Sequence, residues 1–164
     1  QYAAFGRTLL MMYLVSGNHD YLFKCSRLIH HFYNYLHYDS AANSYSWNYW
    51  SINSSGEDIS HGAIEVDFAY LCYHQGLFIS HNDMQRFANT FKKKIYAAPL
   101  QCKDKVDGSG NTNTYLDQTG RWINVSDFDK DIYHIVADVF IERALTSSQT
   151  SSGSFLLGLA NLIY

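Results

Sequence analysis

Residues 58–76, DISHGAIEVDFAYLCYHQG, decide the fold that we expect for this chain. Drawn as a helix at about 100° per residue, the stretch carries apolar residues on two sides. One side holds Ile59, Ala63, Val66, Tyr70 and Tyr73, and the other holds Ile64, Phe68 and Leu71. A helix with one solvated face shows a single apolar stripe. We therefore predict a helix that starts near Asp58, ends at Gly76 and is buried around most of its circumference.

A narrow polar stripe runs between the two apolar sides of this helix. His61, Glu65 and Cys72 fall within about 40° of one another, and Asp58 falls within about 60° of His61. A polar stripe bounded by apolar sides suits an inner helix that lines a cleft. We expect His61 and Glu65 to face such a cleft.

Helical periodicity also dominates the sequence on both sides of this stretch. Further helices are expected over about 3–15, 20–37, 82–97 and 126–145, with a last helical segment at the C-terminal end. The expected caps are Asn18 or Asp20, Ser80-x-x-Asp83 and Ser126-x-x-Asp129. Residues 38–57 are expected to form a loop. No segment alternates convincingly as a strand, although RWINV at 121–125 has the composition for brief pairing.

These helices predict an all-α fold of successive antiparallel hairpins, forming part or all of an α/α toroid, an incomplete barrel. The 164 residues, 47% of them hydrophobic and 16% charged, suit a single packed domain over 1–164. The chain opens and closes inside amphipathic patterns, and a complete toroid is longer. We therefore expect a fragment of a longer protein.

Charge and cysteine content exclude several classes of function. A formal net charge of −3 gives no field that would attract nucleic acid or an anionic membrane. No apolar run approaches the roughly 20 residues that span a bilayer, and no signal-peptide pattern is visible. The three cysteines show no CxxC spacing, so neither a zinc site nor a disulfide framework is indicated. We expect no metal and no cofactor.

Large aromatic residues gather in the polar loop before the predicted helix, in SWNYW at 46–50. Tyr and Trp offer flat apolar faces with a polar group, which suits stacking on pyranose rings. Trp47 and Trp50 are candidate stacking platforms, and Asn48 and Tyr49 are candidate hydrogen-bonding groups. The alternative is that the tryptophans plug the end of a helical hairpin.

The polar stripe also has plainer interpretations. His61 and Glu65 at i, i+4 can be an ordinary pair on a helix surface. Glu57 and Asp58 can be acids that only stabilise a helix N-terminus. Metal binding by His61 and Glu65 is disfavoured, because no second histidine stands nearby at ligand spacing.

The segments YSWNYW at 45–50 and EDISHGAIEVDFAYLCYHQGLFISHNDMQRFANTF at 57–91 resemble α/α-toroid proteins that act on uronic-acid polysaccharides, the alginate and glucuronan lyase type. In that pattern an aromatic loop precedes an acid-acid-x-x-His helix start, a G-x-F turn and a helix bearing R-x-x-N-T. The resemblance implies a polysaccharide partner, cleavage by β-elimination and an extracellular or periplasmic location. Toroid glycosidases share parts of the pattern.

β-Elimination requires neutralisation of the substrate carboxylate, a base for the C5 proton and an acid for the leaving oxygen. The expected catalytic residues are His61, Tyr49, Glu65 and Asp58. The expected substrate-binding residues are Trp47, Asn48, Trp50, Glu57 and Arg121, with Tyr115 in the same long loop as Arg121. Two alternatives stay open: a glycoside hydrolase in which Glu57, Asp58 and Glu65 are acid and base, and a non-catalytic glycan-binding domain.

Overall fold

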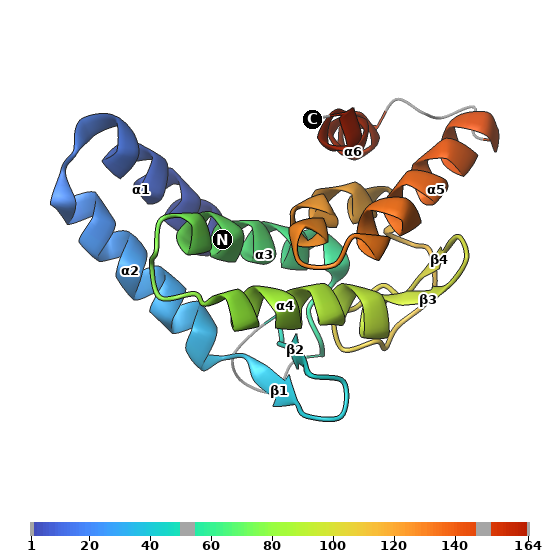
Figure 1. Ribbon diagram of the computed structural model, residues 1–164, viewed down its shortest axis with the longest axis horizontal. Helices are drawn as coiled ribbons and strands as arrows, with labels where there is room; N and C mark the ends of the chain where they lie inside the picture. Colours follow the sequence, from blue (N-terminus) through green and yellow to red (C-terminus); the bar gives the residue numbers. More distant parts are fainter. Residues whose placement is uncertain (1, 50–54, 147–151, 164) are drawn as a thin grey trace.

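Figure 1 shows a computed structural model of the chain that describes residues 2–49, 55–146 and 152–163. The α-helices are α1 (Tyr2–Ser16), α2 (His19–Asn34), α3 (Ile59–His74), α4 (His81–Thr90), α5 (Asp131–Thr146) and α6 (Gly153–Ile163). A π turn, η1 (Phe91–Ile95), extends α4, and a 3-10 segment, η2 (Leu116–Asp127), precedes α5. The strands are β1 (His37–Asp39), β2 (Ser44–Ser46), β3 (Tyr96–Ala98) and β4 (Gln101–Cys102). The described chain is therefore mostly helical, as predicted.

Local capping explains where the early helices begin and end. The side chain of Asn18 accepts the N–H of Asp20 at 2.9 Å, which starts α2. Ser80 and Asp83 form the predicted capping box, in which each side chain accepts the other residue's backbone N–H. Gly76, with φ of +66°, follows the end of α3 in the left-handed conformation that glycine tolerates.

The structure also contains two small antiparallel sheets, which the sequence did not predict. β1 pairs with β2, with Tyr38 opposite Tyr45, in the segment that we expected to be a loop, and β1 begins at His37 because α2 ends at Asn34, earlier than predicted. β3 pairs with β4 immediately after the π turn. Strands of two or three residues are too short to show a period-2 alternation, which is why the sequence did not reveal them.

The start of the fifth helix differs from the prediction. α5 begins at Asp131, and the Asp129 carboxylate accepts the Asp131 N–H at 3.1 Å. Residues 121–125 lie in η2 and therefore do not form a strand. The Ser126-x-x-Asp129 pattern is thus not a capping box.

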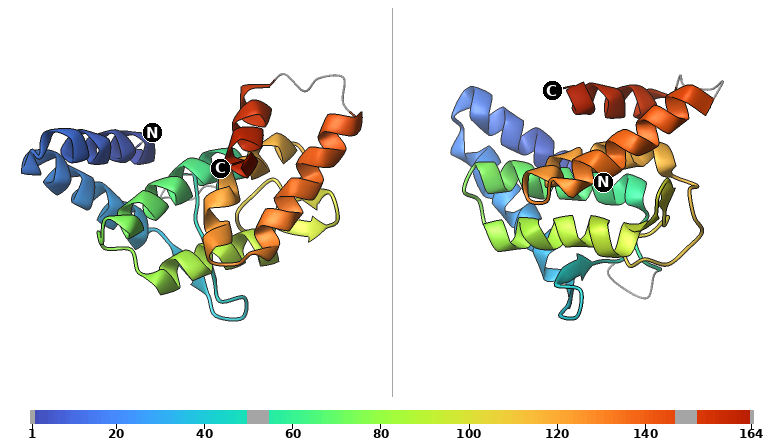
Figure 2. Two further views of the ribbon diagram at one scale, coloured as in Figure 1. Left: turned by 45° about the horizontal axis from the view of Figure 1, so that its top comes forward. Right: turned by 45° about the vertical axis from the view of Figure 1, so that its right-hand side comes forward.

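The helices form two consecutive hairpins with α3 in the middle of the molecule (Figures 1 and 2). α1 packs against α2 at one end, α3 and α4 lie side by side, and α6 packs on η2 at the other end. α3 is buried at eight of its residues, which agrees with a helix covered on most of its circumference. None of the described helices has the length and apolar content needed to cross a bilayer.

Close glycine contacts set the position of α6. A Cβ added at Gly158 would lie 2.2 Å from Cζ of Phe140, and one added at Gly120 would lie 2.4 Å from Cα of Gly158. Phe140 and Phe155 stack with ring centroids 5.0 Å apart. The absence of side chains at the two glycines therefore lets α6 lie directly on η2 and α5.

Candidate functional site

Two distant chain segments hold the start of α3. The N–H of Glu57 donates to the carbonyl of Trp47 at 2.9 Å, and the N–H of Val106 donates to the carbonyl of Glu57 at 2.9 Å. The N–H of Ile59 donates to the carbonyl of Asp104, also at 2.9 Å. The acid pair at 57–58 is therefore fixed between the aromatic loop and the polar loop that follows β4.

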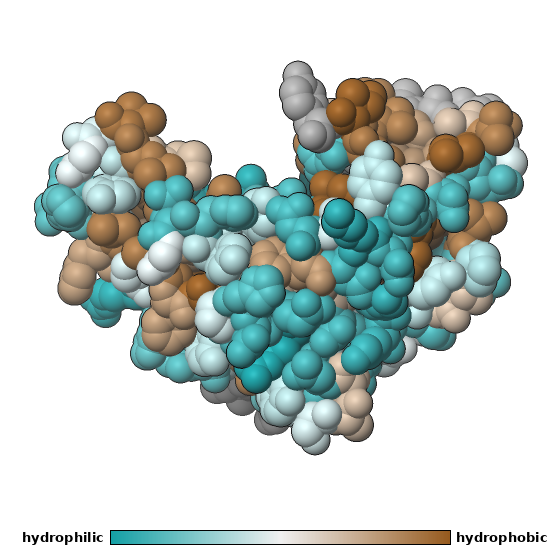
Figure 3. Space-filling view, viewed as in Figure 1, coloured by the Kyte–Doolittle hydropathy of each residue, from teal (hydrophilic) through white to brown (hydrophobic). Residues whose placement is uncertain are grey.

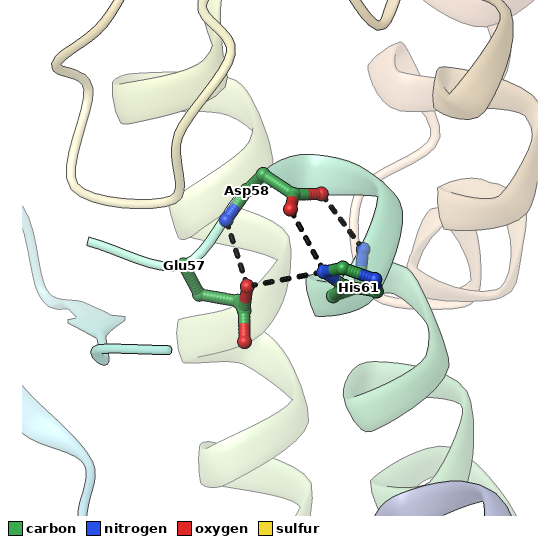
Figure 4. A group of neighbouring side chains, drawn as sticks. All are labelled: Glu57, Asp58 and His61. Atoms are coloured by element: carbon green, nitrogen blue, oxygen red, sulfur yellow. Dashed lines mark hydrogen bonds and ion pairs between the residues drawn. The ribbon is translucent and has the colours of Figure 1, made fainter. Parts of the chain in front are cut away.

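Asp58 has two roles at this point (Figure 4). Its Oδ1 accepts the N–H groups of Ser60 at 2.8 Å and His61 at 2.9 Å, so Asp58 is the N-cap of α3. Its Oδ2 lies 2.8 Å from Nδ1 of His61. The interpretation as a helix N-terminal acid is therefore confirmed for Asp58, which also positions the imidazole.

This contact decides the hydrogen bonding of His61. A carboxylate oxygen only accepts, so Nδ1 carries the hydrogen and Nε2 has the free lone pair in the neutral ring. Among the described residues Nε2 has no hydrogen-bond partner, and the side chain is 54% exposed. His61 therefore presents an exposed ring nitrogen, Nε2, whose lone pair is free in the neutral ring.

Glu57 is chemically unlike its neighbour Asp58. It is only 3% exposed, and its Oε1 accepts the N–H of Asp58 at 3.0 Å and lies 3.6 Å from Nδ1 of His61. Burial, helped by the negative charge of Glu65, raises the pKa of Glu57 to about 8. The raised pKa favours the protonated form of Glu57, which can donate a hydrogen bond.

Glu65 does not face a cleft, which corrects the expectation that it acts with His61. It is buried, accepts the Tyr2 hydroxyl at 2.6 Å on Oε1 and accepts the indole N–H of Trp47 on Oε2. Burial raises its pKa, while these two donors lower it in part. Contacts with Tyr2 and Trp47 enclose the Glu65 carboxyl group, and Asp58 instead holds the tautomer of His61.

Trp47 is also corrected, because it is 1% exposed and cannot stack on a sugar from solvent. Its ring lies 5.6 Å from Phe32, 5.7 Å from Phe87 and 6.5 Å from Trp122, centroid to centroid. Trp47 is therefore a core residue, as in the alternative interpretation in which the tryptophans pack inside the protein. Trp50 lies outside the described residues.

A cavity of about 490 Å³ opens beside the start of α3. It is lined by Tyr49, Glu57, Asp58 and Tyr115, together with Ser55, Gly56, Asp104, Lys105, Gly110, Asn111 and Thr114. His61 is not among these lining residues, but its ring lies 5.5 Å from the ring of Tyr49 and its Nδ1 lies 2.8 Å from Oδ2 of Asp58, and both of these residues line the cavity. Of the predicted residues, the structure thus brings together Tyr49, Glu57, Asp58 and His61. Asn48, which is partly buried and forms an isolated antiparallel β-bridge with Gly56, immediately precedes Tyr49 in the chain.

The polar loop contributes residues that the sequence analysis missed. The buried carboxylate of Asp104 accepts the N–H of Thr114 at 2.9 Å and so ties the two sides of the loop together. This tie brings Lys105 and Asn111 to the cavity. The only sequence signal was the density of Asp, Asn and Thr, which is common in loops of every kind.

Arg121 lies elsewhere, which corrects its expected grouping with Tyr115. It lines a separate cavity between α1, α3, η2 and α6, whereas Tyr115 lines the cavity beside Glu57. Tyr115 immediately precedes η2, whereas Arg121 lies within it. The two side chains therefore line different cavities although they are close in the sequence.

Glu57, Asp58 and His61 also form the only group of potential metal ligands found in the described ranges, with ligand atoms within 4.8 Å of one another. A metal bound through Nδ1 of His61 would break the contact of that nitrogen with Asp58, and a metal bound to Glu57 requires its carboxyl group to be ionised. Figure 4 shows that the three side chains interact with one another: Glu57 Oε1 accepts the N–H of Asp58, and Asp58 Oδ2 lies against Nδ1 of His61.

Comparison with known proteins adds no family: no family model matches the chain, and neither does any curated protein or solved structure.

Proposed function

We propose that the cavity beside the start of α3, which we call the Glu57 cavity, binds an acidic polysaccharide and cleaves it by β-elimination at a uronate residue. The observation that carries this proposal is the buried carboxyl group of Glu57, 3.6 Å from an imidazole that is oriented by Asp58. Burial raises the pKa of this carboxyl group to about 8, which favours its neutral form. A neutral acid beside an oriented base suits a substrate that carries its own negative charge.

The reaction needs a base, an acid and a group that accepts charge on the substrate carboxylate. The base removes the proton at C5, the C–H electrons form the C4=C5 double bond, and the C4–O bond breaks. The leaving oxygen takes a proton from the acid. The products are an unsaturated uronate end and a new hydroxyl end, with no water consumed.

His61 is the group that takes the C5 proton. Asp58 holds Nδ1–H, keeps Nε2 available and stabilises the imidazolium that forms. In this proposal Tyr49, whose ring lies 5.5 Å from the ring of His61, protonates the leaving oxygen with its phenol. Both side chains are about half exposed, so a polymer can reach them.

Glu57 and Lys105 support binding of the uronate carboxylate. A protonated Glu57 donates a hydrogen bond where an ionised one would repel the substrate. Lys105 adds a positive charge on the same cavity wall. Both contacts strengthen as negative charge builds on the carboxylate during proton removal, which is the condition for catalysis.

The contacts support elimination better than hydrolysis. A glycoside hydrolase needs a second, ionised carboxylate that is free to act on the sugar or on water. Both oxygens of Asp58 are already engaged, and Glu65 is sealed in the core. We extend the proposal to the fold, an incomplete α/α toroid with α3 as an inner helix, and to an extracellular or periplasmic location where such polymers occur.

The test is incubation of the chain with alginate, glucuronan and a neutral glucan. We expect ultraviolet absorbance from an unsaturated uronate on an acidic polymer and none on the glucan. New reducing ends without that absorbance would indicate hydrolysis instead. Binding without either product would indicate a glycan-binding domain.

A further inference from the structure

A second cavity, of about 240 Å³, lies between α1, α3, η2 and α6. We call it the Arg121 cavity. The molecule is hollowed between the α1–α2 hairpin and α6, and the four elements that line the cavity border this hollow (Figures 1 and 3). The cavity shares no lining residue with the Glu57 cavity.

The polar part of its lining holds one ion pair that is complete in itself. Nε of Arg7 lies 2.7 Å from Oδ2 of Asp67. Nδ2 of Asn124 donates to the other oxygen of Asp67 at 2.7 Å. The carboxylate of Asp67 is thus satisfied by Arg7 and Asn124, and it leaves no negative charge to neutralise another cation.

Arg121 is the second cation of the cavity and has no such partner. Within residues 2–49, 55–146 and 152–163 its guanidinium makes no ion pair and no hydrogen bond, and its Nε is buried without a hydrogen-bond acceptor. A buried donor without an acceptor destabilises a fold. A guanidinium is always charged and presents parallel donors that match a carboxylate.

The remaining lining residues indicate what kind of anion fits. Ala63, Ile64 and Leu157 supply the apolar part of the lining. Asn161 lines the cavity too, and its Nδ2 donates to the carbonyl of Gly120 at 3.1 Å. Inorganic anions gain nothing from an apolar wall, whereas the carbon skeleton of an organic acid can pack against it.

We propose that the Arg121 cavity is a binding site for a small organic carboxylate, such as a single uronate, held by Arg121 and packed against Ile64 and Leu157. The site does not depend on the elimination chemistry proposed above, because no residue of the Glu57 cavity contributes to it. The close contact of Gly158 with Phe140 and Gly120 brings α6 over η2, so the site exists only when α6 is docked.

The test is calorimetric titration of the 164-residue chain with sodium glucuronate, and separately with sodium sulfate at equal ionic strength. Glucuronate should bind more tightly than sulfate. Arg121→Gln should weaken glucuronate binding about tenfold or more, the scale for a hydrogen-bonded charge pair. Arg27→Gln removes an exposed arginine of α2 and should leave binding unchanged.

Three outcomes would overturn the proposal: equal weakening by both variants, tighter binding of sulfate, or no binding by the folded wild-type chain. Circular dichroism shows whether Arg121→Gln folds. Arg121→Lys keeps the charge and removes the parallel donors, so its binding should lie between those of the other two proteins even if Arg121→Gln is unstable. Full affinity in Arg121→Lys would contradict the carboxylate geometry.

Discussion

The indole N–H of Trp47 donates to the carboxyl group of Glu65, which lies 18 residues further along the chain. The other oxygen of that group accepts the hydroxyl of Tyr2. One buried carboxyl group therefore joins α1, the aromatic loop and α3, the helix whose start lines the Glu57 cavity. It couples the stability of the core to the placement of the site.

Trp47→Ala is expected to cost about 3–5 kcal/mol of unfolding free energy, the range for removing a large buried aromatic ring. It deletes the contacts with Phe32, Phe87 and Trp122 and also leaves Glu65 short of a donor. Denaturant unfolding measures the loss. Trp47→Phe, which keeps a ring and removes only the N–H, should cost less. A fully stable Trp47→Ala protein with weaker sugar binding would restore the stacking role.

Glu57 should make stability fall as pH rises. Its carboxyl group has a pKa of about 8 when folded against 4.5 in the unfolded chain, so the folded state holds more protons between those values. The free energy of unfolding therefore decreases from about pH 4.5 to about pH 8 through this group. Glu57→Gln stays neutral and should show a flatter profile over that window. Identical slopes in the two proteins would show that Glu57 is ionised in the fold.

His61→Gln should lower elimination on a uronate polymer by roughly 10² or more, the scale for loss of a general base. The change removes the nitrogen that accepts the C5 proton but leaves the helix cap by Asp58 in place. The assay is ultraviolet absorbance of the product, alongside circular dichroism. His74→Gln, an exposed change on the same helix, should keep full activity. Normal turnover by folded His61→Gln would remove His61 from the mechanism.

Gly158→Ala should destabilise the docking of α6. The new methyl group would meet Cζ of Phe140 at 2.2 Å, so either the stacked Phe140–Phe155 pair or the helix must move. We expect faster hydrogen exchange in α6 and weaker glucuronate binding at the Arg121 cavity. Gly153→Ala in the same helix meets no atom within 4 Å and should change neither. Equal behaviour of the two variants would exclude the close packing.

Several features were predictable because they depend on neighbours in the chain. The caps at Asn18 and Ser80, the left-handed Gly76 and the burial of α3 follow from hydrogen bonds and periodicity within a few residues. Asp58 and His61 also meet as an i, i+3 pair of one helix turn. The same locality explains why the paired strands and η2 were missed, since short strands and 3-10 turns have little sequence periodicity.

The roles of Glu65, Trp47 and Arg121 were decided by tertiary structure alone. Helical projection placed Glu65 correctly beside His61, but it could not show that Tyr2, 63 residues away, would cover it. A tryptophan in a polar loop has the same sequence pattern whether it faces solvent or the core. Arg121 was separated from Tyr115 by the course of η2. Which face of a helix is solvated depends on what packs against it, and for these residues the packing partners come from distant parts of the chain.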